Sequence, residues 1–300
     1  MESIDSGKLI KHLAGIVPIA GRPLEFNMPW HDAMMPLAAN YFSIEKSIYE
    51  CALAGCETIW LVAHYGTHPI LRKRIGDFVV DPKSYDYLKR GGPTRLIPVY
   101  YVPISPKDKK KRDSLSWSVL YGAYMAHRVC KFISKWTIPE RFYCSFPYGV
   151  PDPYFIMNYR INLSKNNKTI FTYKNKSVKD NLHVSFTFDP KDYFSCRDIV
   201  RQRDLGTWKD HKLNAALYDL QTVYKGLDTE DATMIELPWF YDISTWDGYR
   251  EFLASEHSKI FKRPKHFFTQ YKKRIFLNEQ DGREQIQSDE QLSQDENKSS

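Results

Sequence analysis

The clearest pattern of apolar and polar positions in the chain lies in residues 13–63. Apolar runs at 16–19 and 58–63 flank the segment 43–53, whose apolar residues recur on one side of a helix. Gly55 follows this segment, in the position of a helix C-terminal cap. A nearly continuous apolar run such as 58–63 is typical of a strand buried on both faces. We therefore predict a strand, a helix and a parallel strand joined by a right-handed crossover.

Strands and helices continue to alternate along the rest of the chain. Further predicted strands lie at 96–102, 141–145, 182–188 and 234–237, and further predicted helices at 69–76, 114–135, 212–225 and 263–276, with one more opening at Pro190. Residues 106–113 are predicted to be a basic loop and 146–155 an aromatic loop. The strict alternation of 182–188 predicts a half-exposed strand in an antiparallel part of the sheet. The fold class is therefore α/β, with a mixed, mostly parallel central sheet flanked by helices.

Composition limits the domain plan and the cell compartment. Three hundred residues allow one large domain, which we place at 13–277, after a polar lead-in at 1–12. The acidic, Gln- and Ser-rich segment 278–300 is predicted to be disordered. No apolar run has the length of a membrane span, and five scattered cysteines without a C-x-x-C pair favour reduced thiols. We expect a cytoplasmic protein, in a host cytoplasm if it is viral.

The net charge of +7 hides a basic body and an acidic tail. A basic body favours anionic ligands such as nucleotides, sugar phosphates or nucleic acid, although most of these charges suit a solvated surface equally well. The segment 262–274 mixes bases with aromatic residues. This mixture suits nucleic acid, but it also suits a helix that packs its aromatic side chains on the body.

The end of the first predicted strand is a candidate ligand site. Gly21 and Arg22 follow that strand directly. Ligands of open α/β sheets bind at the carboxyl ends of the strands, and a glycine there lets the backbone approach a phosphate closely. An ordinary turn and a surface ion pair explain the same two residues, so both interpretations stay open.

Several landmarks then occur in one order. They are the strand and turn I-V-P-I-A-G-R at 16–22 with Pro29 behind it, A-G-C-E-T-I-W-L-V at 54–62, S-L-S-W-S at 114–118, and W-F-Y-D-I-S-T at 239–245 with Tyr249 after it. In this order the chain resembles the sugar-1-phosphate nucleotidyltransferases, such as the glucose-1-phosphate thymidylyl- and uridylyltransferases. The resemblance covers residues 13–258 and implies a Rossmann-like nucleotide-diphospho-sugar transferase fold.

The resemblance also implies an activity and a set of site residues. The activity is Mg²⁺-dependent transfer of a nucleotidyl group from a nucleoside triphosphate to a sugar phosphate, with release of pyrophosphate. The implied roles are nucleotide binding at Gly21, Arg22, Ser114, Leu115 and Trp117, Mg²⁺ binding at Asp242, and sugar-phosphate binding at Lys174. Asp152 is the nearest acid to the position of a second metal ligand, and His31 could act on the phosphates in place of a lysine.

Some positions depart from that family pattern. Trp30 stands where the family has a lysine that touches the phosphates, and Ser145-Phe146 stands where it has Gly-Asp. Each site residue also has a structural explanation: a helix cap for Asp242, a turn for Asp152, a core aromatic for Trp117. Two alternatives therefore stay open: a repurposed member that binds a nucleotide or nucleic acid without catalysis, and a glycosyltransferase that uses a nucleotide-sugar. The pattern leaves the oligomeric state open.

Overall fold

The computed structural model describes residues 12–21, 24, 26, 28–84, 95–165, 167–206, 218–265 and 267–268. The chain divides into two compact units, residues 1–263 and 264–300. The first unit contains the helices and strands described below, and in the second the rings of Phe267 and Phe268 meet edge to face. Residues 263–265 are not helical, which corrects the predicted start of the last helix. The predicted lead-in 1–11 and tail 278–300 lie outside the described residues.

A large mixed sheet forms the centre of the first unit. Its strands lie in the order β11-β9-β10-β7-β1-β4-β6-β5. Their bounds are β1 (Leu13–Pro18), β4 (Thr58–Ala63), β5 (Phe78–Val80), β6 (Leu96–Pro103), β7 (Arg141–Cys144), β9 (Thr169–Thr172), β10 (Phe186–Phe188) and β11 (Thr233–Glu236). Strands β5 and β10 run antiparallel to their neighbours, and the other neighbouring pairs are parallel. The predicted α/β class with a mixed, mostly parallel sheet is confirmed.

The predicted strand–helix–strand unit is present at the start of this sheet. Helix α1 (Ser43–Ala54) connects β1 to β4, and the two strands pair in parallel along their length. Gly55 ends the helix with a φ of 93°, a left-handed conformation that glycine adopts without a Cβ penalty. The helix, its cap and the strand at 58–63 are thus confirmed.

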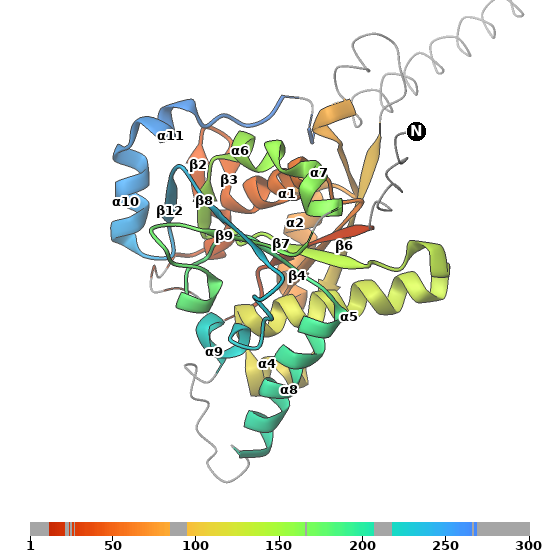
Figure 1. Cartoon of the computed structure of the whole chain (residues 1–300). Helices are drawn as coiled ribbons and strands as arrows, with labels where there is room; N and C mark the ends of the chain where they lie inside the picture. Colours follow the sequence, from red (N-terminus) through yellow and green to blue (C-terminus); the bar gives the residue numbers. More distant parts are fainter. Residues whose placement is uncertain are drawn as a thin grey trace, which may run out of the picture. The chain divides into compact units, whose positions relative to one another are not determined.

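Helices cover both faces of the sheet (Figure 1). One face carries α1 with α6 (Pro153–Asn158) and α7 (Arg160–Lys165) beside it. The other carries α5 (Leu115–Ile133), with α8 (Pro190–Gly206) and α9 (Leu220–Tyr224) packed on α5. Helix α2 (His68–Ile75) follows β4 and lies against β6. Gly122 lets α5 approach the sheet closely, because a Cβ there would lie 2.7 Å from Val62 Cγ2 and 2.9 Å from Ile16 Cγ2.

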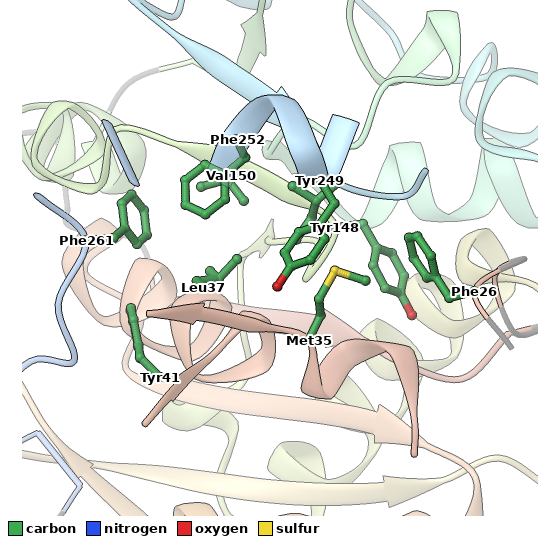
Figure 2. Packing of buried hydrophobic residues seen from close by; sticks show 10 residues of the cluster. Phe26, Met35, Leu37, Tyr41, Tyr148, Val150, Tyr249, Phe252 and Phe261 are labelled. Atoms are coloured by element: carbon green, nitrogen blue, oxygen red, sulfur yellow. The ribbon is translucent and has the colours of Figure 1, made fainter. Parts of the chain in front are cut away.

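A second apolar cluster lies beside the main sheet (Figure 2). It is built from two small antiparallel sheets and two helices: β2 (Pro36–Ala38) with β3 (Tyr41–Phe42), β8 (Gly149–Pro151) with β12 (Phe240–Asp242), α10 (Trp246–Ala254) and α11 (Glu256–Ile260). Figure 2 shows Tyr249 and Phe252 of α10 facing Met35 and Leu37 across the cluster. Tyr249 also donates its hydroxyl hydrogen to Pro36 O at 2.7 Å. This cluster joins the segment after β1 to the segment that carries Asp242.

Three local predictions are wrong, each for a physical reason. Residues 106–112 form helix α4 (Pro106–Arg112), because Ser105 caps it and Pro106 occupies its first position. The expected loop after β7 contains β8 and then α6, since Asp152 caps that helix in the same manner. Strand β10 is short and buried on both faces rather than half-exposed, because the Thr187 hydroxyl bonds with the Thr169 backbone inside the sheet.

The cysteines agree with the expectation of reduced thiols. All five cysteines are buried and none is in a disulfide. Over the described part of the chain, we find no helix with the length and apolar character of a membrane span. For the predicted helix at 212–225, the structure describes α9, in which Leu220 and Val223 are buried as expected. Residues 212–217 lie outside the described residues.

Candidate functional site

One edge of the sheet collects the carboxyl ends of six strands. Strands β1, β4, β6, β7, β9 and β11 run in the same direction. From β1 the chain first builds β4 and β6 on one side and then returns to build β7 on the other. The connection order therefore reverses between β1 and β7, and open α/β sheets bind ligands outside the strand ends at such a point. The predicted site residues can be judged by their positions relative to this edge.

The turn after β1 meets the start of helix α5. A Cβ at Gly21 would lie 3.2 Å from Leu115 N and 3.4 Å from the carbonyl carbon of Ser114. The Ser118 hydroxyl fixes the same junction by donating a hydrogen bond to Ala20 O. Ser114 is the N-cap of α5, and its hydroxyl accepts a hydrogen bond from Trp117 N at 3.2 Å. Three of the predicted nucleotide-binding residues, Gly21, Ser114 and Leu115, are thus brought together; Arg22 lies outside the described residues.

Trp117 lies one turn into α5 and is already covered on one face. The Arg112 guanidinium carbon lies 4.0 Å from the centre of its ring, in a cation–π contact. Its indole Nε1 is buried and makes no hydrogen bond within the described residues. The indole is therefore part of the wall beside Ser114, with Arg112 over one face of its ring and the Tyr121 ring nearby.

His31 contributes a neutral imidazole near the same edge. Its Nδ1 accepts a hydrogen bond from Ala33 N at 3.2 Å, which assigns the proton to Nε2. Burial lowers the pKa of His31; the carboxylate of Asp32 opposes this shift, and the nearby His64 adds to it. At neutral pH His31 is therefore an N–H donor for a phosphate oxygen rather than a cation.

His64 and His68, four residues apart in sequence, do not form a metal pair. His64 precedes a short 3₁₀ turn (Tyr65–Thr67), whereas His68 begins α2, so the two residues do not lie on one α-helix. His64 instead pairs with Asp113 at 2.8 Å between Nε2 and Oδ1. This pair, which the sequence analysis missed, ties the end of β4 to the residue that follows α4. The two residues are 49 positions apart, and no local pattern marks them.

Asp242 ends β12 with its carboxylate held from two sides. Its Oδ2 lies 2.9 Å from His183 Nδ1, and its Oδ1 accepts a hydrogen bond from Ser244 N at 3.0 Å. Burial raises the pKa of Asp242, but the contacts with His183 and Ser244 outweigh it and the pKa lies below its usual value. The side chain keeps 26% of its surface exposed. Asp242 is therefore an ionised, accessible carboxylate.

The backbone opposite Asp242 requires glycine. Gly149 of β8 pairs with Asp242, and a Cβ at this glycine would stand 2.0 Å from the His183 carbonyl oxygen. The close approach of strand β8 places His183 next to Asp242. His183 is a further site residue that the sequence analysis missed, since it lies 59 residues from its partner.

Asp152 is not brought to Asp242. It lies three residues beyond Gly149, about 10 Å of extended strand from the position opposite Asp242. Its Oδ1 accepts hydrogen bonds from Tyr154 N at 2.9 Å and Phe155 N at 3.3 Å. No group of three His, Cys, Asp or Glu side chains with metal-binding geometry occurs in the described ranges. Asp242 alone suits a Mg²⁺ ion that takes its other ligands from phosphates and water.

Lys174 lies at the carboxyl end of β9, on the same edge. Its backbone adopts a φ of 51° in a tight turn, and its N–H donates to Glu236 Oε1 at 2.5 Å. Its ammonium lies 5.0 Å from the ring centre of Tyr173, and that ring contacts Phe240 of β12. The lysine is exposed, and through Tyr173 it lies near the start of β12.

A buried ion pair lies beneath this part of the site. Lys46 donates to Glu50 Oε2 at 3.1 Å and to Phe146 O at 2.9 Å, and it also donates to Gly149 O. Glu50 in turn accepts hydrogen bonds from Tyr143 and Ser185. Both charges are almost completely buried. The pair holds the segment after β7 against α1, and through Gly149 it supports the strand opposite Asp242.

One cavity in the described part of the chain lies along strand β11. It has a volume of about 360 Å³ and is lined by Tyr159, Asn162, Thr169 and the whole of β11. Strand β11 is the fourth neighbour of β1 in the sheet, so this cavity is far from Gly21. The candidate site therefore rests on the converging side chains and not on cavity size.

Comparison with known proteins supports the fold. No family model and no curated protein matches the chain in sequence. Among solved structures, it is similar to a Bacillus anthracis protein described as a glucose-1-phosphate thymidylyltransferase and solved with sucrose, at 9% identity and a TM-score of 0.54, over 85% of this chain and 98% of that one. It is also similar to a UDP-glucose pyrophosphorylase complexed with UDP-glucose, at 13% identity and a TM-score of 0.52, over 84% and 100% of the two chains. The chain thus has the Rossmann-like fold of the sugar-phosphate nucleotidyltransferases.

Proposed function

We propose that this protein is a Mg²⁺-dependent nucleotidyltransferase that transfers the nucleotidyl group of a nucleoside triphosphate to a sugar phosphate. A phosphate oxygen of the sugar attacks the α-phosphorus, and the bond from that phosphorus to the bridging oxygen of pyrophosphate breaks. The observation that carries the proposal is the ionised, accessible carboxylate of Asp242, which lies opposite Gly149 in the strand β8 that follows the carboxyl end of β7. The junction of Gly21 with α5 follows the carboxyl end of β1, the neighbour of β7 in the sheet. The shared fold supports it.

The nucleotide end of the site would lie at Gly21 and the start of α5. Gly21 leaves the backbone open to close approach, and the N-terminus of a long helix offers N–H groups and a favourable dipole to phosphate. His31 can donate from Nε2 to a phosphate oxygen without carrying a charge of its own. These groups bind and orient the triphosphate, which is most of what phosphoryl-type transfer needs from a protein.

The acceptor end of the site would lie at Asp242 and Lys174. Asp242 would hold Mg²⁺, and the metal when bound supplies positive charge to the phosphates during transfer. His183 positions the carboxylate, and Ser244 N holds its second oxygen. Lys174 offers an exposed ammonium to the phosphate of the sugar.

The experiment measures pyrophosphate released from each nucleoside triphosphate in the presence of Mg²⁺ and a panel of sugar 1-phosphates. We expect one pair to release pyrophosphate, and Asp242→Asn to lower kcat by about 10²-fold or more, as loss of one transition-state contact does. Asp247→Asn is the matched control, since Asp247 lies five residues away with its side chain 97% exposed.

Other outcomes contradict the proposal. Full activity of Asp242→Asn would show that the reaction does not need the Asp242 carboxylate. Release of a nucleoside diphosphate from a nucleotide-sugar, without pyrophosphate, would indicate a glycosyltransferase. No turnover by a folded sample that still binds nucleotide would indicate the repurposed member.

A further inference from the structure

Helix α4 carries a concentrated positive charge. Five of its seven residues are basic and one is acidic, which gives it a net charge of +4. The acid, Asp108, is neutralised within the helix, because Arg112 Nε donates to its Oδ1 at 2.9 Å. The side chains of Lys107, Lys109 and Lys110 are exposed. The positive charge therefore faces solvent.

The lysines of α4 are closer together than the helix alone would favour. Lys107 and Lys110 are three residues apart, and like charges at this spacing destabilise a helix by a few tenths of a kcal/mol. The favourable position of cations near a helix C-terminus offsets part of this repulsion. Like charges on one face of a short helix run against local helix preferences, and departures of this kind are concentrated at functional sites.

Both ends of α4 are anchored at the end of β4, on the edge of the candidate site. At its start, Ile104 N donates to Ala63 O at 3.1 Å. At its end, Asp113 pairs with His64 at 2.8 Å. Arg112 packs on Trp117, one turn into α5. The helix is thus a fixed projection from the carboxyl edge of the sheet.

The lysines lie within reach of the junction at Gly21. Ser114 contacts the Cβ position of Gly21, and Lys110 is four residues from Ser114, at most about 14 Å of extended chain. The Debye length at physiological salt is about 8 Å, so these ammonium groups act on a phosphate where their flexible side chains extend towards it. A triphosphate at Gly21 would extend into the field of these ammonium groups.

From this placement we propose that α4 binds the β- and γ-phosphates of the nucleoside triphosphate. This inference rests on the proposed function, because it assumes that the nucleotide lies at Gly21 and α5. Lys107, Lys109 and Lys110 act as mobile cations on the outer phosphates, which become the pyrophosphate product. The site therefore favours triphosphates over monophosphates by charge.

The experiment measures binding by calorimetry to the full chain, with inorganic tripolyphosphate and a matched nucleoside triphosphate and monophosphate as probes. The variant is K107Q/K109Q/K110Q. The control is K131Q/K135Q/K191Q, which removes the same charge from exposed lysines elsewhere on the surface. We expect the α4 variant to lose about tenfold in tripolyphosphate and triphosphate affinity, equivalent to about 1.4 kcal/mol, with monophosphate affinity unchanged. The control stays within about twofold of the parent chain.

Three results would overturn the inference: no binding of tripolyphosphate by the parent chain, equal losses in both variants, or equal losses for the triphosphate and the monophosphate. Because tripolyphosphate binding needs no turnover, it separates this inference from the proposed reaction. Retained tripolyphosphate binding in a chain that releases no pyrophosphate would contradict the reaction but support the phosphate site on α4. Equal melting temperatures of the three proteins confirm that the substitutions leave the fold intact.

Discussion

Two regions of the central sheet, one around β1 and β4 and the other around β7 and β10, are stabilised by different kinds of contact. We call them the apolar side and the polar side. Around β1 and β4, helix α5 packs through apolar atoms, and Gly122 lies directly against Ile16 and Val62. Around β7 and β10, wholly buried polar groups meet, with Lys46, Glu50 and Tyr143 in one network. The first region depends on close packing, whereas the second also depends on hydrogen bonds between buried polar groups. The candidate site spans both, with Gly21 and the start of α5 on the apolar side and Asp242 on the polar side.

The difference matters because removing one partner of a buried ion pair destabilises the fold more than trimming an apolar contact does. An apolar contact that is trimmed loses only its own share of buried area and packing. A buried ion pair that loses one partner leaves the other charge without compensation. We therefore expect the support beneath Asp242 to be the more easily damaged half of the site.

The largest predicted effect tests the polar side. Lys46→Met leaves Glu50 buried without its cation and should lower the free energy of unfolding by about 3–5 kcal/mol in urea denaturation. In Lys46→Met/Glu50→Leu both charges are gone, and we expect a clear part of that loss to be recovered. If single and double variants are equally unstable, the carbonyl contacts of Lys46 and not its charge stabilise the segment after β7.

The next effect tests the apolar side. Gly122→Ala places a methyl group within 3 Å of side-chain carbons of Val62 and Ile16. Overpacking of this kind costs about 1–3 kcal/mol, and the same urea experiment measures it. An unchanged or higher stability would show that α5 can move away from the sheet, and that the packing there is looser than the structure indicates.

A smaller effect separates the two aspartates of the predicted metal site. Asp152→Ala removes the N-cap of α6 and should cost about 1 kcal/mol of stability, while the Mg²⁺ dependence of nucleotide binding stays unchanged. Asp152→Asn keeps a capping side chain and should be close to neutral. If nucleotide binding by Asp152→Asn no longer depends on Mg²⁺, Asp152 is a ligand of the metal and this prediction is wrong.

The smallest effect is a pH dependence at Asp242. Its folded pKa is lowered, so the stability it contributes is complete above the unfolded value of about 3.9 and is lost as the pH falls through the folded value. The unfolding free energies of the parent chain and Asp242→Asn should therefore differ by a constant amount from about pH 7 to pH 5 and converge below about pH 4. A gap that instead narrows as pH rises would mean that the pKa is raised.

The apolar side was predictable from the sequence because its signals are local. The run at 58–63 and the glycine at 55 are each recognisable within a few residues, and each is confirmed. The antiparallel part of the sheet was also predicted from the alternation at 182–188, although β10 is shorter and more buried.

The polar side was not predictable, because its partners are distant in sequence. His183 meets Asp242 across 59 residues, and Lys46 meets Gly149 across 103. Helix α4 was predicted as a basic loop, whereas the Ser105 cap and the Asp108–Arg112 pair stabilise a helix there. Contacts of this kind depend on the fold, so a single sequence can suggest the residue types but not the pairs.

The most direct measurement of the central claim is nucleotide-dependent thermal stabilisation, with and without Mg²⁺, of the parent chain, Asp242→Asn and Asp152→Asn. A ligand at about 100 times its dissociation constant adds about 2.7 kcal/mol to the native state. We predict that one nucleoside triphosphate stabilises the parent chain and Asp152→Asn only with Mg²⁺, and that Asp242→Asn loses this Mg²⁺-dependent part. Stabilisation that is independent of Mg²⁺, or absent for every triphosphate, would contradict the account.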